Sequence, residues 1–318
     1  MKKFFLSLVA MMIATVSFAQ NTLVATLTHG DEISMYYGIY AYQNAMKAAV
    51  DGDVINLSGG VFESTNITKS VTIRGTGIND ANPTYIRGGF SIEIKDSINR
   101  LTIEGVRINN DITAKGQLNN AYFVKDYVSR FTTSGTIKNA TFANCEIANL
   151  YIYSANSSLQ CINSIINIYS MDRSCSSTSS ATFVNCVLTD NQYYSSYYVS
   201  MFMNCIFSNT SSTSVLILPS SATVVNCVST RDIFGAIIGK NNKIADLSIF
   251  KDSNPYNDLT DEAKATYLGT DGTPVGIYGG ALPYNTTPSY PQITKMNVAN
   301  KTTADGKLSV EIEVSAAQ

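Results

Sequence analysis

A short segment that recurs about every twenty residues constrains the fold of this chain more than any other feature. Its five clearest copies end at positions 145, 164, 186, 205 and 227, so successive copies are 19, 22, 19 and 22 residues apart. Looser copies precede them at Leu101–Val106 and Ala121–Asp126, and an earlier one at Val71–Thr76. A period near twenty residues predicts a solenoid, in which each repeat forms one coil and stacks on the next.

The residue pattern within each copy indicates which kind of solenoid forms. Each copy reads apolar, variable, Asn or Gly, small, variable, apolar, as in Phe142–Ile147. This pattern is typical of a strand, a one-residue bend and a second strand, because Asn and Gly tolerate the left-handed backbone that such a bend requires. We therefore expect parallel strands stacked about 4.8 Å apart. We also expect the bend asparagines to form an inward ladder, in which each side-chain amide makes a hydrogen bond to the next coil. These residues are Asn144, Asn163, Asn185, Asn204 and Asn226.

Two further segments resemble parts of a known superfamily. Tyr42–Phe62 is similar to the opening of right-handed parallel β-helix proteins of the pectate-lyase-like superfamily, and Leu268–Gly280 is similar to a segment near the other end of exported members. The resemblance covers roughly residues 40–283. It implies an all-β, right-handed parallel β-helix of about nine coils, with a short amphipathic helix that covers the first coil through Ala45, Ala48 and Ala49.

The two ends of the chain differ from the repeats. Lys2 and Lys3, the apolar run Phe4–Phe18 and the small Ala19 predict a secretory signal that is cleaved after Ala19. We expect residues 20–283 to form the β-helix with its N-terminal cap, and residues 284–318 to form a strap and a β-hairpin around Asp305 and Gly306 that caps the solenoid. The protein is then exported, whether secreted, periplasmic or on the cell surface, with no membrane span, and we expect a monomer.

Six cysteines in an exported chain raise the question of disulfides. Four of them, Cys145, Cys186, Cys205 and Cys227, occupy the small position of the repeat, which the register turns inward. Cys145 has Ser164 in place of a cysteine on the next coil, and the other three form a run that cannot pair completely. The pattern favours buried free thiols that pack as small apolar groups.

Composition excludes several functions. The formal net charge of −2 offers no basic surface for nucleic acid. A single histidine and the absence of tryptophan remove the Gly-His-Gly and Trp-Ile-Asp-His motifs of the hydrolases and lyases that share the β-helix fold. No CxxC pair is present, so we expect no metal cofactor. The loop from Asp252 to Asp258 carries oxygen side chains of the kind that Ca²⁺ binds, although it lacks the central Gly and distal Glu of an EF-hand loop.

One group of charged residues in the repeats suggests an enzyme. Asp172 and Asp190 lie about one coil apart, and Arg173 follows the first of them. Two carboxylates in one groove perform glycoside hydrolysis, and an arginine beside them suits a polysaccharide lyase. The simpler interpretation, which we favour, is that these residues belong to solvated turns.

Tyrosines are the stronger functional signal. Tyr151 and Tyr153 alternate on a predicted strand, and Tyr194, Tyr197 and Tyr198 fall at the corresponding place two coils later, with Tyr193 beside them. An outward stack of such rings can lie against sugars while the hydroxyls bond them. The simpler interpretation is that tyrosines suit an exposed β surface. The sequence predicts a non-catalytic exported protein that binds an extracellular polysaccharide, another glycan or a cell-surface partner. The alternatives are a polysaccharide lyase or glycoside hydrolase, and a purely structural or adhesive envelope protein.

Overall fold

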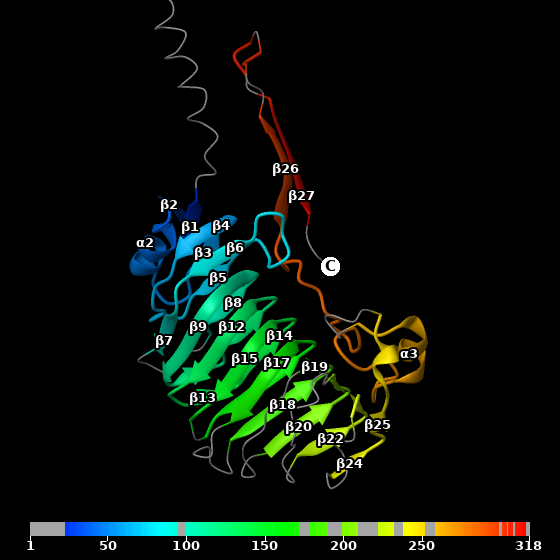
Figure 1. Cartoon of the computed structure of the whole chain (residues 1–318). Coiled ribbons are helices and arrows are strands. Elements are labelled where there is room, and N and C mark those ends of the chain that lie inside the picture. The colour runs from blue at the N-terminus through cyan, green and yellow to red at the C-terminus, as the bar shows by residue number, and fades with distance from the viewer. Residues whose placement is uncertain are drawn as a thin grey trace, which may run out of the picture.

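The chain folds into an all-β parallel solenoid of about seven turns, slightly fewer than the nine that we expected. The structure is a computed structural model, and it describes residues 23–94, 100–154, 156–171, 179–189, 199–208, 222–231, 238–251, 258–298, 301–303, 305–307 and 309–315. Figure 1 shows the strands stacked side by side along the solenoid. The predicted signal sequence, residues 1–19, lies outside the described residues.

Two long sheets form the sides of the solenoid, and a strand of one sheet leads across a bend to a strand of the other. The first sheet contains, in spatial order, β2 (Glu32–Tyr37), β1 (Val24–His29), β3 (Val54–Leu57), β5 (Thr72–Arg74), β8 (Thr102–Glu104), β11 (Tyr122–Val124), β14 (Ala140–Ala143), β16 (Ser158–Ile162), β18 (Ser180–Val184), β20 (Val199–Met203), β22 (Thr223–Val225) and β24 (Ile238–Lys240). The second contains β25 (Lys243–Ile244), β23 (Val228–Ser229), β21 (Ile206–Phe207), β19 (Val187–Leu188), β17 (Ile165–Met171), β15 (Glu146–Ile152), β12 (Tyr127–Thr133), β9 (Val106–Gly116), β6 (Thr84–Arg87) and β4 (Gly60–Glu63), with β7 (Phe90–Ile94) also paired to β9. A short third pair joins β10 (Leu118–Asn119) to β13 (Ile137–Lys138).

Each bend between the two sheets has the left-handed backbone that the repeat predicts. The five bend asparagines have φ angles between 45° and 56°, and Gly105 and Lys125 hold the same position in earlier coils with φ angles of 71° and 56°. The next residue points inward and accepts a hydrogen bond from the bend of the preceding coil. Ser164 Oγ, for example, accepts from the Cys145 N–H at 3.0 Å. The backbone N–H group after the bend is thereby satisfied within the core.

One member of this inward column is a carboxyl group. Asp126 is completely buried and accepts hydrogen bonds from the backbone N–H groups of Val106 and Val124. Its burial raises the pKa of the carboxyl above its ordinary value, because desolvation penalises the charged form more than these N–H groups stabilise it. The five described cysteines are all buried and free, as the repeat register predicted, and Cys175 lies outside the described residues.

The N-terminal end is closed by a helix and by a hairpin that the sequence did not predict. Helix α2 (Ala41–Ala48) buries Ala41, Tyr42, Ala45 and Met46 against the first coils, whereas Ala48, which we expected on this apolar face, is exposed. Strands β1 and β2 pair antiparallel ahead of it, through the turn at Gly30. The larger Tyr42 and Met46 side chains thus supply apolar surface that alanines alone could not.

The single histidine of the chain lies at this end and makes a testable contact. His29 Nδ1 is 2.7 Å from Asp53 Oδ1, and this hydrogen bond, followed by the attraction of the carboxylate, raises the pKa of His29 above 6.5. Protonated His29 therefore stabilises the fold fully below the unfolded-state pKa of about 6.5, and the contribution is lost as the pH rises through the higher folded-state value. We expect the one imidazole resonance in an NMR titration to report this raised pKa, and Asp53→Asn to return it toward 6.5. A wild-type pKa at or below 6.5 would contradict the contact.

The other end of the solenoid is covered by residues 245–251 and 258–277, which include the 3-10 helix η1 (Leu247–Ile249) and α3 (Asp261–Thr266). Here Val187, Ile206 and Val228 point away from the main core and pack against this segment. They form a second apolar cluster with Ile249, Phe250, Leu259, Ala263, Val275 and Ile277. The outer side of the second sheet is therefore buried at β19, β21 and β23.

Residues 268–291, which we call the strap, then run back along the bends toward the N-terminal end (Figure 1). Asn204 Oδ1 accepts from the Thr270 N–H at 2.9 Å, and Asn163 Nδ2 donates to the carbonyls of Ile277 and Gly279 at 2.9 and 2.8 Å. Farther along, Asn144 Oδ1 accepts from the Asn285 N–H at 3.0 Å, and Glu104 accepts from the Ser289 N–H at 2.7 Å. Our expectation for the asparagine ladder is thereby corrected: these three amides bind the strap outside the bends. Asn226 also donates to the strap, at the Leu268 carbonyl, and among the described contacts of the five asparagines its amide alone bonds the next coil, where it accepts from Asn241.

The chain continues into an antiparallel hairpin of β26 (Gln292–Val298) and β27 (Val310–Ser315). We expected this hairpin to cap the solenoid. Instead it projects away from the coils (Figure 1), and Val310, Ile312 and Val314 are exposed. A two-stranded ribbon has too little apolar area to cover a coil by itself, and the last coils are covered by the α3 segment described above.

Candidate carbohydrate-binding face

The outer side of the second sheet carries a continuous group of polar and aromatic side chains on β9, β12 and β15. Ile112, Phe131, Leu150 and Ile152 point into the core and are buried, so strand alternation turns the residues between them outward. We call the outward set the tyrosine face: Asp111, Thr113, Arg130, Thr132, Asn149, Tyr151 and Tyr153. Asp111, Arg130 and Asn149 are register neighbours on successive strands, and so are Thr113, Thr132 and Tyr151.

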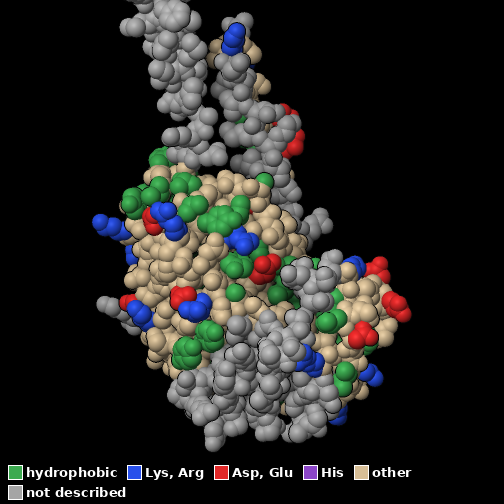
Figure 2. All heavy atoms as spheres, viewed as in Figure 1, with side chains coloured by type: hydrophobic (Ala, Val, Ile, Leu, Met, Phe, Trp, Pro, Cys, Tyr) green, Lys and Arg blue, Asp and Glu red, His purple; other side chains and the backbone are tan. Residues whose placement is uncertain are grey.

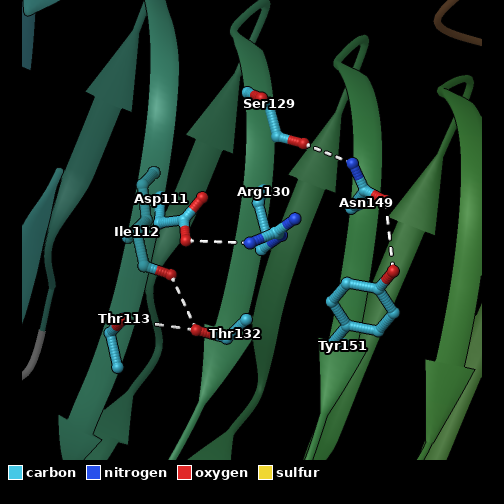
Figure 3. Close-up of polar contacts among 8 residues, drawn as sticks. All are labelled: Asp111, Ile112, Thr113, Ser129, Arg130, Thr132, Asn149 and Tyr151. Carbon is cyan, nitrogen blue, oxygen red and sulfur yellow. Dashed lines mark hydrogen bonds and ion pairs between the residues drawn. The ribbon is translucent and has the colours of Figure 1, made fainter. Parts of the chain in front are cut away.

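The two tyrosines of this face are held in a defined arrangement. Their rings are nearly parallel, with an interplanar angle of 9° and centroids 5.7 Å apart. Tyr151 donates its hydroxyl hydrogen bond to Asn149 Oδ1 at 3.2 Å, and Asn149 Nδ2 donates to the carbonyl of Ser129 at 3.0 Å (Figure 3). Tyr153 is 45% exposed, while Tyr151 is half-buried. The pair therefore offers aromatic surface to a ligand at little cost in side-chain entropy.

Charged and hydroxyl groups surround the rings. Arg130 Nη1 lies 3.1 Å from Asp111 Oδ2, and the guanidinium carbon lies 6.0 Å from the centroid of the Tyr151 ring. Thr113 and Thr132 Oγ1 atoms are 3.3 Å apart, and Thr132 also donates to the Ile112 carbonyl (Figure 3). Because each charge in this cluster has an opposite charge as its neighbour, the tyrosine face presents hydrogen-bonding groups with little net charge. Figure 2 shows blue and red side chains side by side on the surface of the molecule.

Sequence reasoning found the two tyrosines but missed the residues that support them. A usable signal was present, because Asp111, Arg130 and Asn149 are 19 residues apart, as are Thr113, Thr132 and Tyr151. This spacing equals one coil, so each set had to form a row across neighbouring strands. The strap gave no such signal, since its hydrogen bonds to the coils join residues that are 42 to 207 positions apart in the chain.

The remaining predicted site residues fall outside the described residues. These are the acid and base candidates Asp172, Arg173 and Asp190, the tyrosines Tyr194, Tyr197 and Tyr198, and residues 252–257 of the loop considered for calcium. Asp258, the last residue of that loop, is described and pairs with Lys264 and Lys251. Within the described ranges, no three His, Cys, Asp or Glu side chains are grouped to hold a metal ion.

Comparisons with known proteins give no relative from which a function could be transferred. No family model matches the chain, and no curated protein and no solved structure matches it either. Among the helices that the structure describes, none is long and apolar enough to cross a membrane. The function must therefore be argued from the site itself.

Proposed function

We propose that this is an exported, non-catalytic protein of pectate-lyase-like, right-handed β-helix architecture that binds an extracellular carbohydrate through the tyrosine face. The observation that carries the proposal is the parallel pair of Tyr151 and Tyr153, fixed by the hydrogen bond to Asn149 and partly exposed. Sugar rings have an apolar face that packs on aromatic rings and hydroxyl edges that seek hydrogen bonds. The neighbouring Asn149, Asp111 and threonines supply such polar partners.

The position of the site supports the same conclusion. Rows of outward side chains run along the solenoid axis, one residue per coil, so the face is elongated in the direction in which coils are added. A surface that runs along the stacking direction suits a chain-like ligand better than a small molecule, which binds in an enclosed pocket. In the sequence, Tyr194, Tyr197 and Tyr198 fall at the corresponding place of the repeat two coils later, so the proposal includes them in the same surface, although they lie outside the described residues.

The test removes the aromatic pair. We expect the double variant Tyr151→Ala, Tyr153→Ala to bind glycans about 10- to 100-fold more weakly than the wild type, since two aromatic contacts contribute roughly 1–3 kcal/mol. A glycan array followed by calorimetry on the best ligand measures this loss. Tyr122→Ala is the matched control, because Tyr122 is an exposed tyrosine on β11 of the other sheet.

Two results would contradict the proposal. One is a wild-type protein that binds no glycan at millimolar concentration. The other is an equal loss of binding in the Tyr122 control and in the double variant. Release of unsaturated or reducing ends from a polysaccharide, lost in Asp172→Asn or Asp190→Asn, would instead establish the enzyme alternative.

A further inference from the structure

A second row of outward side chains lies at the beginning of the second-sheet strands. Tyr85 on β6, Arg107 on β9 and Tyr127 on β12 are direct register neighbours. Val106, Ile108 and Val128 beside them are buried in the core, which places Arg107 and Tyr127 on the outer side of the sheet, the side that also carries the tyrosine face. We call these three residues the tyrosine–arginine clamp. By strand geometry it lies roughly 15–20 Å from Tyr151.

The guanidinium of Arg107 is fixed from three directions. Its central carbon is 4.4 Å from the ring centroid of Tyr127 and 5.8 Å from that of Tyr85, and Nη1 donates to the Ile78 carbonyl at 3.0 Å. Its Nε is enclosed and has no hydrogen-bond acceptor. The side chain therefore holds its position before any ligand arrives, which is the condition for tight recognition by a long, flexible residue.

Arg107 differs from the other arginines of this sheet in lacking an acidic partner. Arg87 is paired with Glu63, and Arg130 is paired with Asp111. No carboxylate in the described part of the chain forms an ion pair with Arg107. Glu146, the acid nearest to it in the row, is separated from it by Tyr127 and accepts from the Tyr284 hydroxyl at 2.6 Å. A half-buried cation without a counter-charge is unfavourable, and an anionic ligand group would supply what is missing.

From this geometry we infer that the clamp is a subsite for one oxyanion group, a carboxylate or a sulfate, carried by the bound glycan. The inference rests on the proposed function. The planar guanidinium presents its remaining N–H groups to two oxygens of one anion, and the flanking rings exclude water around that contact. Because the clamp contains one cation, and the neighbouring Arg87 and Arg130 are each paired with an acid, it selects a glycan with isolated acidic substituents and not a densely charged polymer.

The experiment compares each glycan in three matched forms. The probes are oligosaccharides that carry one hexuronate, the same oligosaccharides with that carboxyl reduced to the alcohol, and the reduced forms carrying one sulfate ester at that alcohol. Isothermal titration calorimetry is expected to show that the wild type prefers an acidic form over the neutral form by about tenfold or more, and the two acidic arms identify which oxyanion it takes.

Variants separate this subsite from the tyrosine face. Arg107→Gln is expected to abolish the preference while leaving the affinity for the neutral form within about twofold, and Arg107→Lys is expected to retain part of it. Arg87→Gln, which removes an arginine of the adjacent strand β6 that already has a partner, serves as the matched control and should retain the preference. Thermal unfolding of each variant confirms that the fold is intact.

The outcomes distinguish the two proposals. Equal wild-type affinity for acidic and neutral forms, or a preference that survives in Arg107→Gln, overturns the inference about the clamp and leaves carbohydrate binding in place. The expected 10- to 100-fold loss of binding in the Tyr151→Ala, Tyr153→Ala variant, with the preference of the wild type removed by Arg107→Gln, supports both. A wild type that binds none of the forms overturns both.

Discussion

Replacement of Asn163 by leucine is expected to lower the free energy of unfolding by about 3–5 kcal/mol. Asn163 has a φ of 45°, a conformation that costs a non-glycine residue roughly 1–2 kcal/mol unless a local polar contact compensates. Its buried amide also donates to the carbonyls of Ile277 and Gly279 in the strap. Leucine would keep the strained backbone and lose both hydrogen bonds. The buried Gly279 carbonyl would then lack a donor, at about 1–3 kcal/mol, while the Ile277 carbonyl would keep only the Tyr284 N–H, 2.7 Å away.

Asn163→Gly is the matched control for this prediction. Glycine adopts the left-handed bend without strain, so it loses only the two hydrogen bonds to the strap. Urea unfolding of the wild type and the two variants measures the free energy of unfolding of each protein. The loss in the glycine variant reports the two hydrogen bonds, and the difference between the variants reports the backbone strain. A leucine variant within about 0.5 kcal/mol of the wild type would show that the strap contributes little to the fold, because that is the range of an ordinary surface substitution.

The second large effect concerns the aromatic column inside the solenoid. Phe142 is completely buried, stacks on Phe123 of the preceding coil with ring centroids 4.6 Å apart, and meets Phe131 edge-on at 5.1 Å. Phe142→Ala is expected to lower the free energy of unfolding by about 3–5 kcal/mol, since it removes these contacts and leaves a cavity that the surrounding strands cannot close.

Each coil of a solenoid is stabilised by its two neighbours, so the cavity is expected to weaken the coils on both sides of Phe142. Hydrogen exchange should therefore increase in β11 and β16 as well as in β14. Thr141→Ala, an outward substitution on the same strand, is the control and should change the stability by less than about 0.5 kcal/mol. A Phe142 variant as stable as this control would contradict the packing.

Much of the fold could be predicted because the same short residue pattern recurs in each coil. The inward position of Phe142, the bend at Asn144 and the inward Cys145 follow from the apolar spacing and from the backbone preference of asparagine. Both are properties of a few adjacent residues, and the repetition made them visible. The outward position of Tyr151 followed from the same alternation, which is why part of the candidate site could be found in the sequence.

The residues that support the tyrosines, and the clamp around Arg107, depend on a different kind of information. Arg107 meets Tyr85 and Tyr127 across strands that are about twenty residues apart in the chain, and its carbonyl partner Ile78 belongs to a loop outside the repeat. The register of several strands together determines whether an arginine has an acidic neighbour. No local sequence pattern predicts this.

The sequence by itself determined the parallel solenoid, its inward and outward faces and the left-handed bends, because these depend on alternation and on backbone preferences within one coil. Only the tertiary structure decided what covers the bends and the last coils. The strap binds Asn163, Asn204 and Glu104 through hydrogen bonds to residues far away in the chain, and the α3 segment covers Val187, Ile206 and Val228. Such contacts depend on the surfaces that remain exposed after the coils have stacked. They therefore form only in the assembled fold.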